Sequence, residues 1–312
     1  MQFWPRKRAN RSVARVRSWA LTEKAQLLGF AGYKVGMTHV IAEDNRPKSL
    51  TKGEKISLPV SVIECPALKI ASVRLYKDNK VLSEYLSKNL NKELARKLAL
   101  PKKEGKNLDD VKPEDFDELR VNVYTQPRLT AIGKKKPEFF EMGVGGSNEE
   151  ALNYVKENLG KEISVADIFS EGQVVDAHVI TKGKGFQGSV KRFGVSIRAA
   201  KSEKVKRAPG SIAGGWKAHG HMMYRVPDAG QTGYHTRTEY NKQILSIGQD
   251  PSAVNPKSGF VRYGNVKNTY VLIKGSVGGS RKRLVKFCMP LRKKGQEAFN
   301  VLNISTESKQ GK

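Results

Sequence analysis

A stretch of 47 residues, 194–240, most constrains how this chain can fold. It contains no Leu, no Phe and only five Val or Ile residues, while Gly, Lys, Arg and aromatic rings are frequent. Ordering a backbone costs about 1–2 kcal/mol per residue, and the burial of apolar side chains is the main contribution that offsets this cost. The stretch cannot bury enough apolar surface by itself, so we expect that it either stays flexible or is ordered by another molecule.

Charge is distributed unevenly along the 312 residues. The chain carries 57 Lys and Arg against 30 Asp and Glu, which gives a formal net charge of +27. Three segments are strongly cationic: residues 1–20 hold six basic residues and no acid, residues 182–217 hold ten against Glu203 alone, and residues 274–294 hold eight and no acid. Residues 138–177 are acidic. Cationic blocks without acids are typical of chains that bind nucleic acid or another anionic surface.

Other features of the sequence exclude some classes of protein. No apolar run approaches the roughly 18 residues of a membrane span, which excludes an integral membrane protein. Two cysteines, Cys65 and Cys288, provide no disulfide framework and predict a reducing compartment. The Arg-rich N-terminus is compatible with an organellar transit peptide, but it lacks a run of Ser and contains Trp4-Pro5. We therefore expect a cytoplasmic protein without a secretory signal.

Short strand patterns recur on both sides of a central segment. Alternating or β-branched residues predict strands at 36–42, 56–64, 70–76, 119–125, 173–181, 243–248, 260–266, 268–275 and 284–289. Such strands, punctuated by Gly, Asn and Pro, predict a mixed α+β, mainly β fold with a closed or nearly closed barrel. The expected organisation is a basic arm at 1–30, barrel parts at 31–76, 166–195 and 243–312, an α/β insertion at 77–165, and a basic extension rich in Gly and aromatic residues at 196–242.

Two helices are expected within the insertion. A leucine recurs every four residues and would form one broad helical stripe, at Leu82, Leu86, Leu90, Leu94 and Leu98. The second helix would begin at Ser147, which with Glu150 fits a capping box, and would end at Gly160.

A glycine-rich run, Gly183-Lys184-Gly185-Phe186-Gln187-Gly188, directly follows a predicted strand. Its spacing matches the fingerprint of dinucleotide-binding folds, but that site also needs a helix to start there. We expect no helix after Gly188, and Glu203, at the spacing of the acidic partner, lies in an irregular basic stretch. We favour an alternative in which the glycines let the backbone approach a polyanion that Lys182, Lys184, Lys191 and Arg192 neutralise.

Histidine and tryptophan residues of the extension suggest contacts with bases. His219, His221 and His235 lack the fourth ligand and the defined spacing of a zinc site, so stacking on RNA or hydrogen bonding to it is the more economical interpretation. Trp216 lies among small and basic residues, which favours the tip of an extended loop over a core position. A Cys–His nucleophilic pair is the alternative to two buried thiols in apolar strands. We expect no metal and no cofactor.

Three runs of residues together resemble a known family. They are Gln2-Phe3-Trp4-Pro5-Arg6-Lys7-Arg8-Ala9, Gly32-Tyr33-Lys34-Val35-Gly36-Met37-Thr38-His39 and Thr181-Lys182-Gly183-Lys184-Gly185-Phe186-Gln187-Gly188-Ser189-Val190-Lys191-Arg192. Over essentially its whole length the chain is similar to the family of large-subunit ribosomal protein number three. The runs 209–216 and 229–238 resemble the archaeal and eukaryotic branch, and the length favours an archaeal member.

The resemblance implies a fold, partners and a site. It implies a barrel of the translation-protein type with an inserted α/β domain and long basic extensions, and binding to large-subunit rRNA near its 3′ end early in subunit assembly. It also implies that Trp216 lies at a loop tip that reaches toward the peptidyl-transferase centre, and that the neighbours are the large-subunit proteins numbered fourteen and twenty-four-e. Eukaryotic relatives carry a His where this chain has Lys204, so a role of that His is not transferred.

The expected function is therefore that of a structural, non-catalytic rRNA-binding protein without a small-molecule substrate. Residues expected to contact RNA are Trp4, Arg6, Lys7, Arg8, Arg11, Arg15, Lys182, Lys184, Lys191, Arg192, Arg198, Lys201, Lys204, Lys206, Arg207, Trp216, Lys217, His219, His221, Arg225, His235, Arg237, Arg281, Lys282 and Arg283. Glycines expected at close approaches are Gly183, Gly185, Gly188, Gly214 and Gly215. The alternatives are an RNA-modifying or nucleotide-dependent enzyme that uses the loop 183–188, and a basic chaperone or membrane-surface protein, which would need an amphipathic cationic helix.

Overall fold

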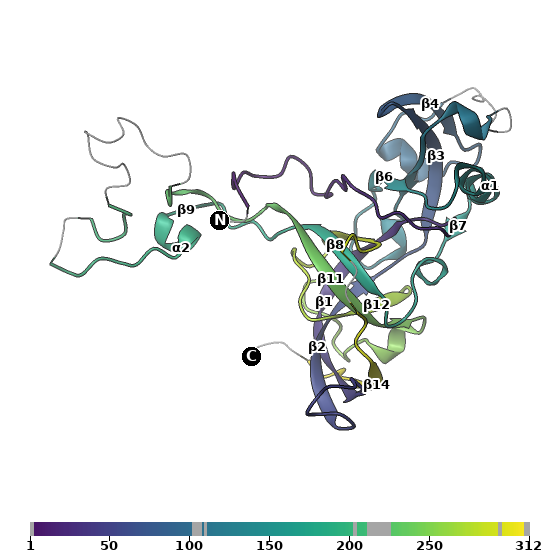
Figure 1. Ribbon diagram of the computed structural model, residues 1–312. Coiled ribbons are helices and arrows are strands. Elements are labelled where there is room, and N and C mark those ends of the chain that lie inside the picture. Colours follow the sequence, from purple (N-terminus) through teal and green to yellow (C-terminus); the bar gives the residue numbers. More distant parts are fainter. Residues whose placement is uncertain are drawn as a thin grey trace. The chain divides into compact units, whose positions relative to one another are not determined.

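The computed structural model describes residues 3–101, 108, 111–201, 205–210, 226–292 and 295–308 (Figure 1). The chain divides into two units. We call Met1–Ser12 with Ile180–Arg237 the extension unit, and Val13–Val179 with Thr238–Lys312 the sheet unit. The fold is mainly β, as expected.

The strands of the sheet unit form two sheets. The larger sheet has the order β13-β8-β11-β12-β2-β1-β14, and β1 also pairs with β13. Its strands are β1 (Gly29–Asp44), β2 (Lys55–Glu64), β8 (Val174–Ile180), β11 (Thr236–Gly248), β12 (Tyr270–Lys274), β13 (Leu284–Cys288) and β14 (Phe299–Ile304). The smaller sheet has the order β4-β3-β5-β6, with β7 paired to β3. Its strands are β3 (Leu68–Lys77), β4 (Lys80–Leu86), β5 (Glu118–Tyr124), β6 (Phe139–Gly143) and β7 (Glu162–Ile163).

Few helices accompany these strands. The helix α1 (Asn148–Asn158) begins as expected, because the Ser147 side chain accepts a hydrogen bond from the Glu150 amide and the Glu150 side chain accepts one from the Ser147 amide. The chain turns past its end at Gly160, which has a positive φ of 79°. Single 3₁₀ turns are η1 (Lys92–Arg96), η2 (Pro113–Asp115), η3 (Pro127–Leu129), η4 (Val165–Asp167) and η5 (Pro251–Ala253).

The prediction of a helix along the leucine stripe is wrong. Asp78 and Asn79 both have positive φ and form a tight two-residue turn, so the chain folds back as the β3–β4 hairpin. Leu82 and Leu86 then lie on the exposed edge strand β4, while Leu94 is buried in a small cluster with Ala71 and Tyr124. The turn signal therefore outweighs the four-residue spacing.

The prediction of a strand at 260–266 is also wrong. The backbone turns back on itself there, with Phe260 bridged to Gly264 and Arg262 at a positive φ of 62°. The buried carboxylate of Glu64 holds the following loop by accepting hydrogen bonds from the amides of Lys267 (2.9 Å) and Asn268 (3.0 Å). A side chain thus provides the bonds that a strand ladder would provide.

The two sheets share one hydrophobic core. It includes Phe30, Tyr33, Ile63, Leu75 and Phe287, all almost completely buried. Val13 and Trp19, from the segment expected to be an arm, pack against this core. Both cysteines are free and buried, and burial raises the pKa of the Cys288 thiol to about 12. Buried, protonated thiols fit the apolar role expected for them.

Lys286 places a charge inside this core. It lies on β13 between Ala31 and His178 and is only 3% exposed, with its ammonium 4.0 Å from the centre of the Phe140 ring. Burial lowers the pKa of Lys286 from 10.5 to about 8, although Cys288 and Glu141 act in the opposite direction. The charged form is therefore less favourable in the folded chain than in the unfolded chain.

The Lys286→Met substitution is expected to stabilise the fold. Below pH 8 the penalty is about 3 kcal/mol, from which the lost cation–π contact subtracts about 1 kcal/mol. Because the folded pKa is the lower one, wild-type stability should rise between pH 8 and 10.5, and this increment should vanish in the variant. Urea midpoints at about pH 7 and 9.5 test both statements, since stability depends on the protons bound by each state. A lower midpoint for Lys286→Met at pH 7 would contradict them.

Candidate nucleic-acid interface

The extension unit is built without a hydrophobic core among its described residues. Two short strands, β9 (Phe186–Gln187) and β10 (Gly230–Gln231), pair with each other, and the helix α2 (Ser189–Phe193) follows β9. Backbone bonds extend this pairing: the Lys184 amide donates to the Thr232 carbonyl (2.9 Å) and the Thr232 amide to the Gly185 carbonyl (2.8 Å). The glycine-rich run is thus one side of a small hairpin.

Arginine side chains and aromatic rings take the place of a core. Arg6 lies over the Phe193 ring at 4.3 Å, and Trp4 lies 6.0 Å from the same ring. Arg237 lies 4.4 Å from the centre of the Phe3 ring. These contacts leave the charges in place while ordering the N-terminal residues against α2.

Arg192 is a structural tie within the unit. Its guanidinium donates to the carbonyls of Gln231 (3.0 Å) and Asp228 (2.9 Å), and Arg6 donates in turn to the Arg192 carbonyl (2.5 Å). Burial, with the nearby charge of Arg6 as a further cause, lowers the pKa of Arg192. Because some of its N–H donors are bonded to carbonyls, the guanidinium has fewer donors left for an anion.

His235 is buried, and both of its ring nitrogens are engaged. Nε2 accepts from the Gly233 amide (3.0 Å), and Nδ1 lies 2.8 Å from the Lys7 carbonyl, to which it donates. Burial lowers the pKa of His235, which favours this neutral form. The ring therefore ties residues 181–235 to the N-terminal segment, and its contact with RNA remains a prediction.

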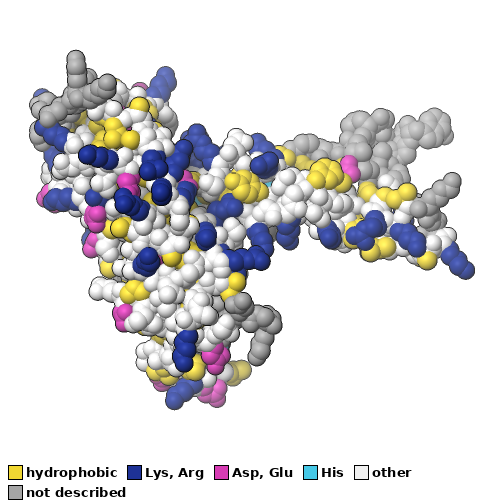
Figure 2. Space-filling model, turned by 180° about the vertical axis from the view of Figure 1, so that it is seen from behind, with side chains coloured by type: hydrophobic (Ala, Val, Ile, Leu, Met, Phe, Trp, Pro, Cys, Tyr) yellow, Lys and Arg dark blue, Asp and Glu magenta, His cyan; other side chains and the backbone are white. Residues whose placement is uncertain are grey.

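Apart from Arg6, Arg192, Arg198 and Arg237, the cations that the structure describes in this unit are exposed. They are Lys7, Arg8, Arg11, Lys182, Lys184, Lys191, Lys201, Lys206 and Arg207. Asp228 is the one acidic residue that the structure describes in this unit, and the ion pairs between described residues, such as Arg74–Glu84 and Arg120–Glu118, lie in the sheet unit. Among the charged side chains of the extension unit in Figure 2, dark blue Lys and Arg accordingly prevail over magenta Asp and Glu. The result is a surface of one sign.

The other predicted residues fall into three groups. Arg15, Arg281, Lys282 and Arg283 belong to the sheet unit, where Arg281 and Lys282 are exposed. Arg198 is half-buried in the extension unit. Lys204, Gly214, Gly215, Trp216, Lys217, His219, His221 and Arg225 lie outside the described residues, as does Glu203.

The structure adds one residue that sequence reasoning missed. Phe186, in β9, is 76% exposed and lies two residues after Lys184, the exposed, glycine-flanked lysine of the run. An exposed aromatic ring in a cationic strand offers a stacking surface for a base. The available signal was an aromatic residue in an acid-free, glycine-rich segment.

Our expectation that no helix follows Gly188 is wrong. The helix α2 starts at Ser189 with Gly188 as its N-cap, but it is five residues long and ends at Gly194 in the left-handed conformation. So short a helix lacks the length of the phosphate-binding helix of dinucleotide folds. Among the described residues, no cluster of three His, Cys, Asp or Glu side chains could hold a metal, and no helix there is long and apolar enough to span a membrane.

The Gly233→Val substitution is expected to open the hairpin. Gly233 has a φ of 72°, and an added Cβ would lie 2.1 Å from the Lys182 carbonyl oxygen. The strain, about 1–3 kcal/mol, is large for a unit without a core. Hydrogen–deuterium exchange at the amides of Lys184 and Thr232 should become faster.

Gly188→Ala is the matched control for that experiment. Gly188 has an ordinary φ of −68°, and nothing lies within 4 Å of an added Cβ. Exchange should therefore stay at the wild-type rate in Gly188→Ala. Unchanged exchange in Gly233→Val would show that the hairpin does not depend on this glycine.

Comparisons with known proteins agree with this geometry. The family described as Ribosomal protein L3 matches residues 1–311. The large ribosomal subunit protein uL3 of Archaeoglobus fulgidus is 45% identical over 100% of this chain and 97% of its own length. Those of Methanocaldococcus jannaschii and Methanothermobacter thermautotrophicus are 44% and 47% identical, over 100% and 99% of this chain and 96% of each relative. A core-poor cationic unit and a well-packed β unit thus occur in one chain that belongs, over essentially its whole length, to the ribosomal protein L3 family.

Proposed function

We propose that this chain is a structural, non-catalytic constituent of the large ribosomal subunit that binds rRNA through its extension unit. The observation that carries the proposal is the match to the family over residues 1–311, together with a unit whose exposed charged side chains, among the residues that the structure describes, are cationic apart from Asp228. Phosphates neutralised by these cations release their counterions, which supplies most of the binding free energy.

The architecture suggests a division of labour. The larger sheet, in which β1 pairs with both β2 and β13, is proposed to be a translation-protein-type barrel that anchors the chain. The smaller sheet and α1 are proposed to form the inserted α/β domain, which would then begin at β3 rather than at residue 77 as the sequence predicted. The extension unit would supply the RNA contacts, with Phe186 stacking on an unpaired base.

The finer features of the proposal come from the family. The bound RNA would be large-subunit rRNA near its 3′ end, and binding would support early assembly in the cytoplasm. Trp216 would lie at a tip that reaches toward the peptidyl-transferase centre. The neighbouring proteins would be those numbered fourteen and twenty-four-e.

Sedimentation tests the proposal directly. A tagged copy of the chain, expressed in an archaeal host, should move with the large subunit in a sucrose gradient and shift with it into whole ribosomes. A matched copy without its extension unit should stay near the top of the gradient. A full-length chain found only near the top would contradict the proposal.

A further inference from the structure

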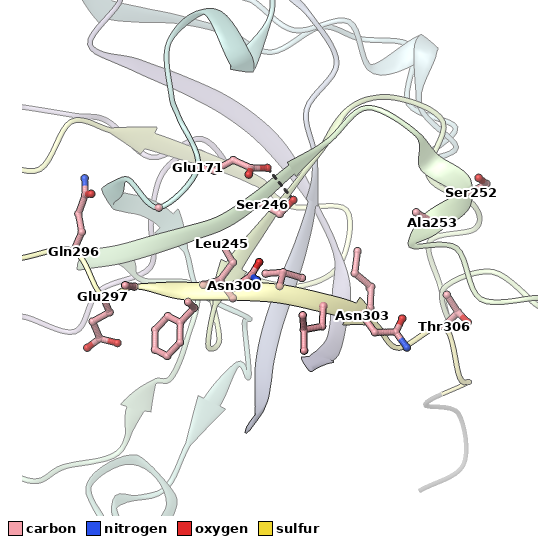
Figure 3. A pocket seen from close by; sticks show the side chains of 16 residues that line it. Glu171, Leu245, Ser246, Ser252, Ala253, Gln296, Glu297, Asn300, Asn303 and Thr306 are labelled. Carbon is pink, nitrogen blue, oxygen red and sulfur yellow. Dashed lines mark hydrogen bonds between the residues drawn. The ribbon is translucent and has the colours of Figure 1, made fainter. Parts of the chain in front are cut away.

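A groove opens in the sheet unit between β14 and β11, on a surface not used by the proposed RNA contacts. Its volume is about 1020 Å³, and β14 provides much of its lining, together with Glu171, Leu245, Ser246 and η5 (Figure 3). All the residues that line it belong to the sheet unit.

The groove exists because the larger sheet closes along only part of β1. One edge of β1 pairs with β2. On its other edge, the first part of β1 pairs with β13 at Gly29–Tyr33, and the later part pairs with β14 at Val40–Asp44. The strand β13 continues the sheet by pairing with β8. In the described part of the chain, however, no strand pairs with the second edge of β14.

The facing edge of β11 is capped by a side chain. Bonds between β11 and the segment before β8 end at Ile244, whose amide donates to the Gln173 carbonyl. Beyond that point the Glu171 carboxylate accepts from the Ile247 amide (2.8 Å) and from the Ser246 hydroxyl (3.0 Å), and Figure 3 draws the bond from Ser246. Two strand edges therefore border the groove without a strand between them.

The unpaired edge of β14 can be assigned residue by residue. The hydrogen bond from the Asn45 amide to the Ala298 carbonyl fixes the alternation along this antiparallel pair as far as Val301, after which the register shifts at a β-bulge. The backbone groups of Asn300 then point toward β1, and those of Phe299 and Val301 point away from it. An exposed row of this kind is a template for an added strand.

The charge of the groove is opposite to that of the chain. None of its lining residues is Lys or Arg, although the chain carries 57 such residues, and two of them, Glu171 and Glu297, are acidic. Glu297 pairs with Lys274, whereas the Glu171 carboxylate accepts hydrogen bonds from a hydroxyl and an amide. Phosphates would be repelled by such a surface, while a cationic polypeptide would be attracted.

We propose that this groove binds an extended, Lys- or Arg-containing segment of another protein, which adds as a strand to the free edge of β14. Main-chain bonds to Phe299 and Val301 would provide affinity, and the carboxylates would select cationic side chains. This interface does not depend on RNA, so it can fail or hold independently of the proposed rRNA contacts.

A labelled peptide of about ten residues with alternating Lys and Val tests the interface on the full-length chain. Its fluorescence anisotropy should show saturable binding at roughly 0.15 M salt. Exchange at the amides of Phe299 and Val301 should slow, while the amide of Asn300, already bonded to β1, should not change.

Asn300→Lys, at an exposed position of the groove, should weaken peptide binding about tenfold by adding a like charge. The matched control is Asn89→Lys, which makes the same change at an exposed position of the loop between β4 and η1 and should bind like wild type. Absence of saturable binding, or equal affinity in the two variants, would overturn the proposal. So would RNA that displaces the peptide from β14, or a second copy of this chain that protects the same amides.

Discussion

The affinity of the purified chain for a transcript of the 3′ part of large-subunit rRNA should fall by about 10³–10⁵ between about 50 and 200 mM salt. This range follows from roughly six to ten phosphate contacts, each of which releases a condensed counterion. The extension unit provides enough exposed cations for that number, and Asp228 is its one described acid. Filter binding over a salt series measures the slope.

The contributions of individual cations to this salt dependence can be measured in the same experiment. Lys182→Gln, Lys184→Gln and Lys191→Gln should each reduce the slope of log K against log salt by about 0.7–0.9. Lys80→Gln is the matched control, because Lys80 is an exposed lysine in the hairpin of the smaller sheet. An affinity that is nearly independent of salt, or the same slope change in Lys80→Gln, would contradict the proposed interface.

Strands that carry local signals were predictable from the sequence. Alternation in 56–64 and 70–76 corresponds to β2 and β3, and the apolar runs at 173–181 and 284–289 correspond to β8 and β13. The capping box at Ser147 located α1 to within a residue. In each case the local pattern and the tertiary environment favour the same structure.

Elements set by distant contacts were not predictable. The strand β14 has exposed Asn300 and Asn303, and its pairing with β1 joins residues more than 250 positions apart. Its sequence alternates too weakly to show which face is buried. The leucine stripe failed for the opposite reason, since a clear spacing was overruled by the turn at Asp78 and Asn79.

Much of the candidate interface was predictable from the sequence, because the charge of a side chain follows from its residue type without knowledge of its contacts. Charge alone does not separate cations that bind a ligand from cations that hold the unit together. Arg192 and His235 were expected to contact RNA, but their described contacts are to backbone groups of Gln231, Gly233 and Lys7. The contacts with Gln231 and Lys7 join residues 39 and 228 positions apart, so only coordinates reveal them.

Glu64→Ala should cause the largest loss of stability of any substitution considered for the sheet unit, about 3–5 kcal/mol. The Glu64 side chain is fully buried and accepts from the Tyr263 hydroxyl, the amides of Lys267 and Asn268, and the Asn268 side chain (2.7 Å). Truncation would leave these donors without an acceptor in a loop that has no ladder of its own. Urea unfolding followed by near-ultraviolet circular dichroism measures the change.

Two further variants test whether the stability loss comes from removing the buried hydrogen-bond acceptor. Glu64→Gln keeps one acceptor oxygen in the same place, so its loss should be about half that of Glu64→Ala. Glu157→Ala, at an exposed position of α1, should change stability by less than about 0.5 kcal/mol. If Glu64→Ala unfolds at the same urea concentration as Glu157→Ala, the loop 263–268 is held by its own turns. If instead its loss is several times larger, one carboxylate holds a loop that no pattern in the sequence assigns to it, because the donors follow the acceptor by some 200 residues.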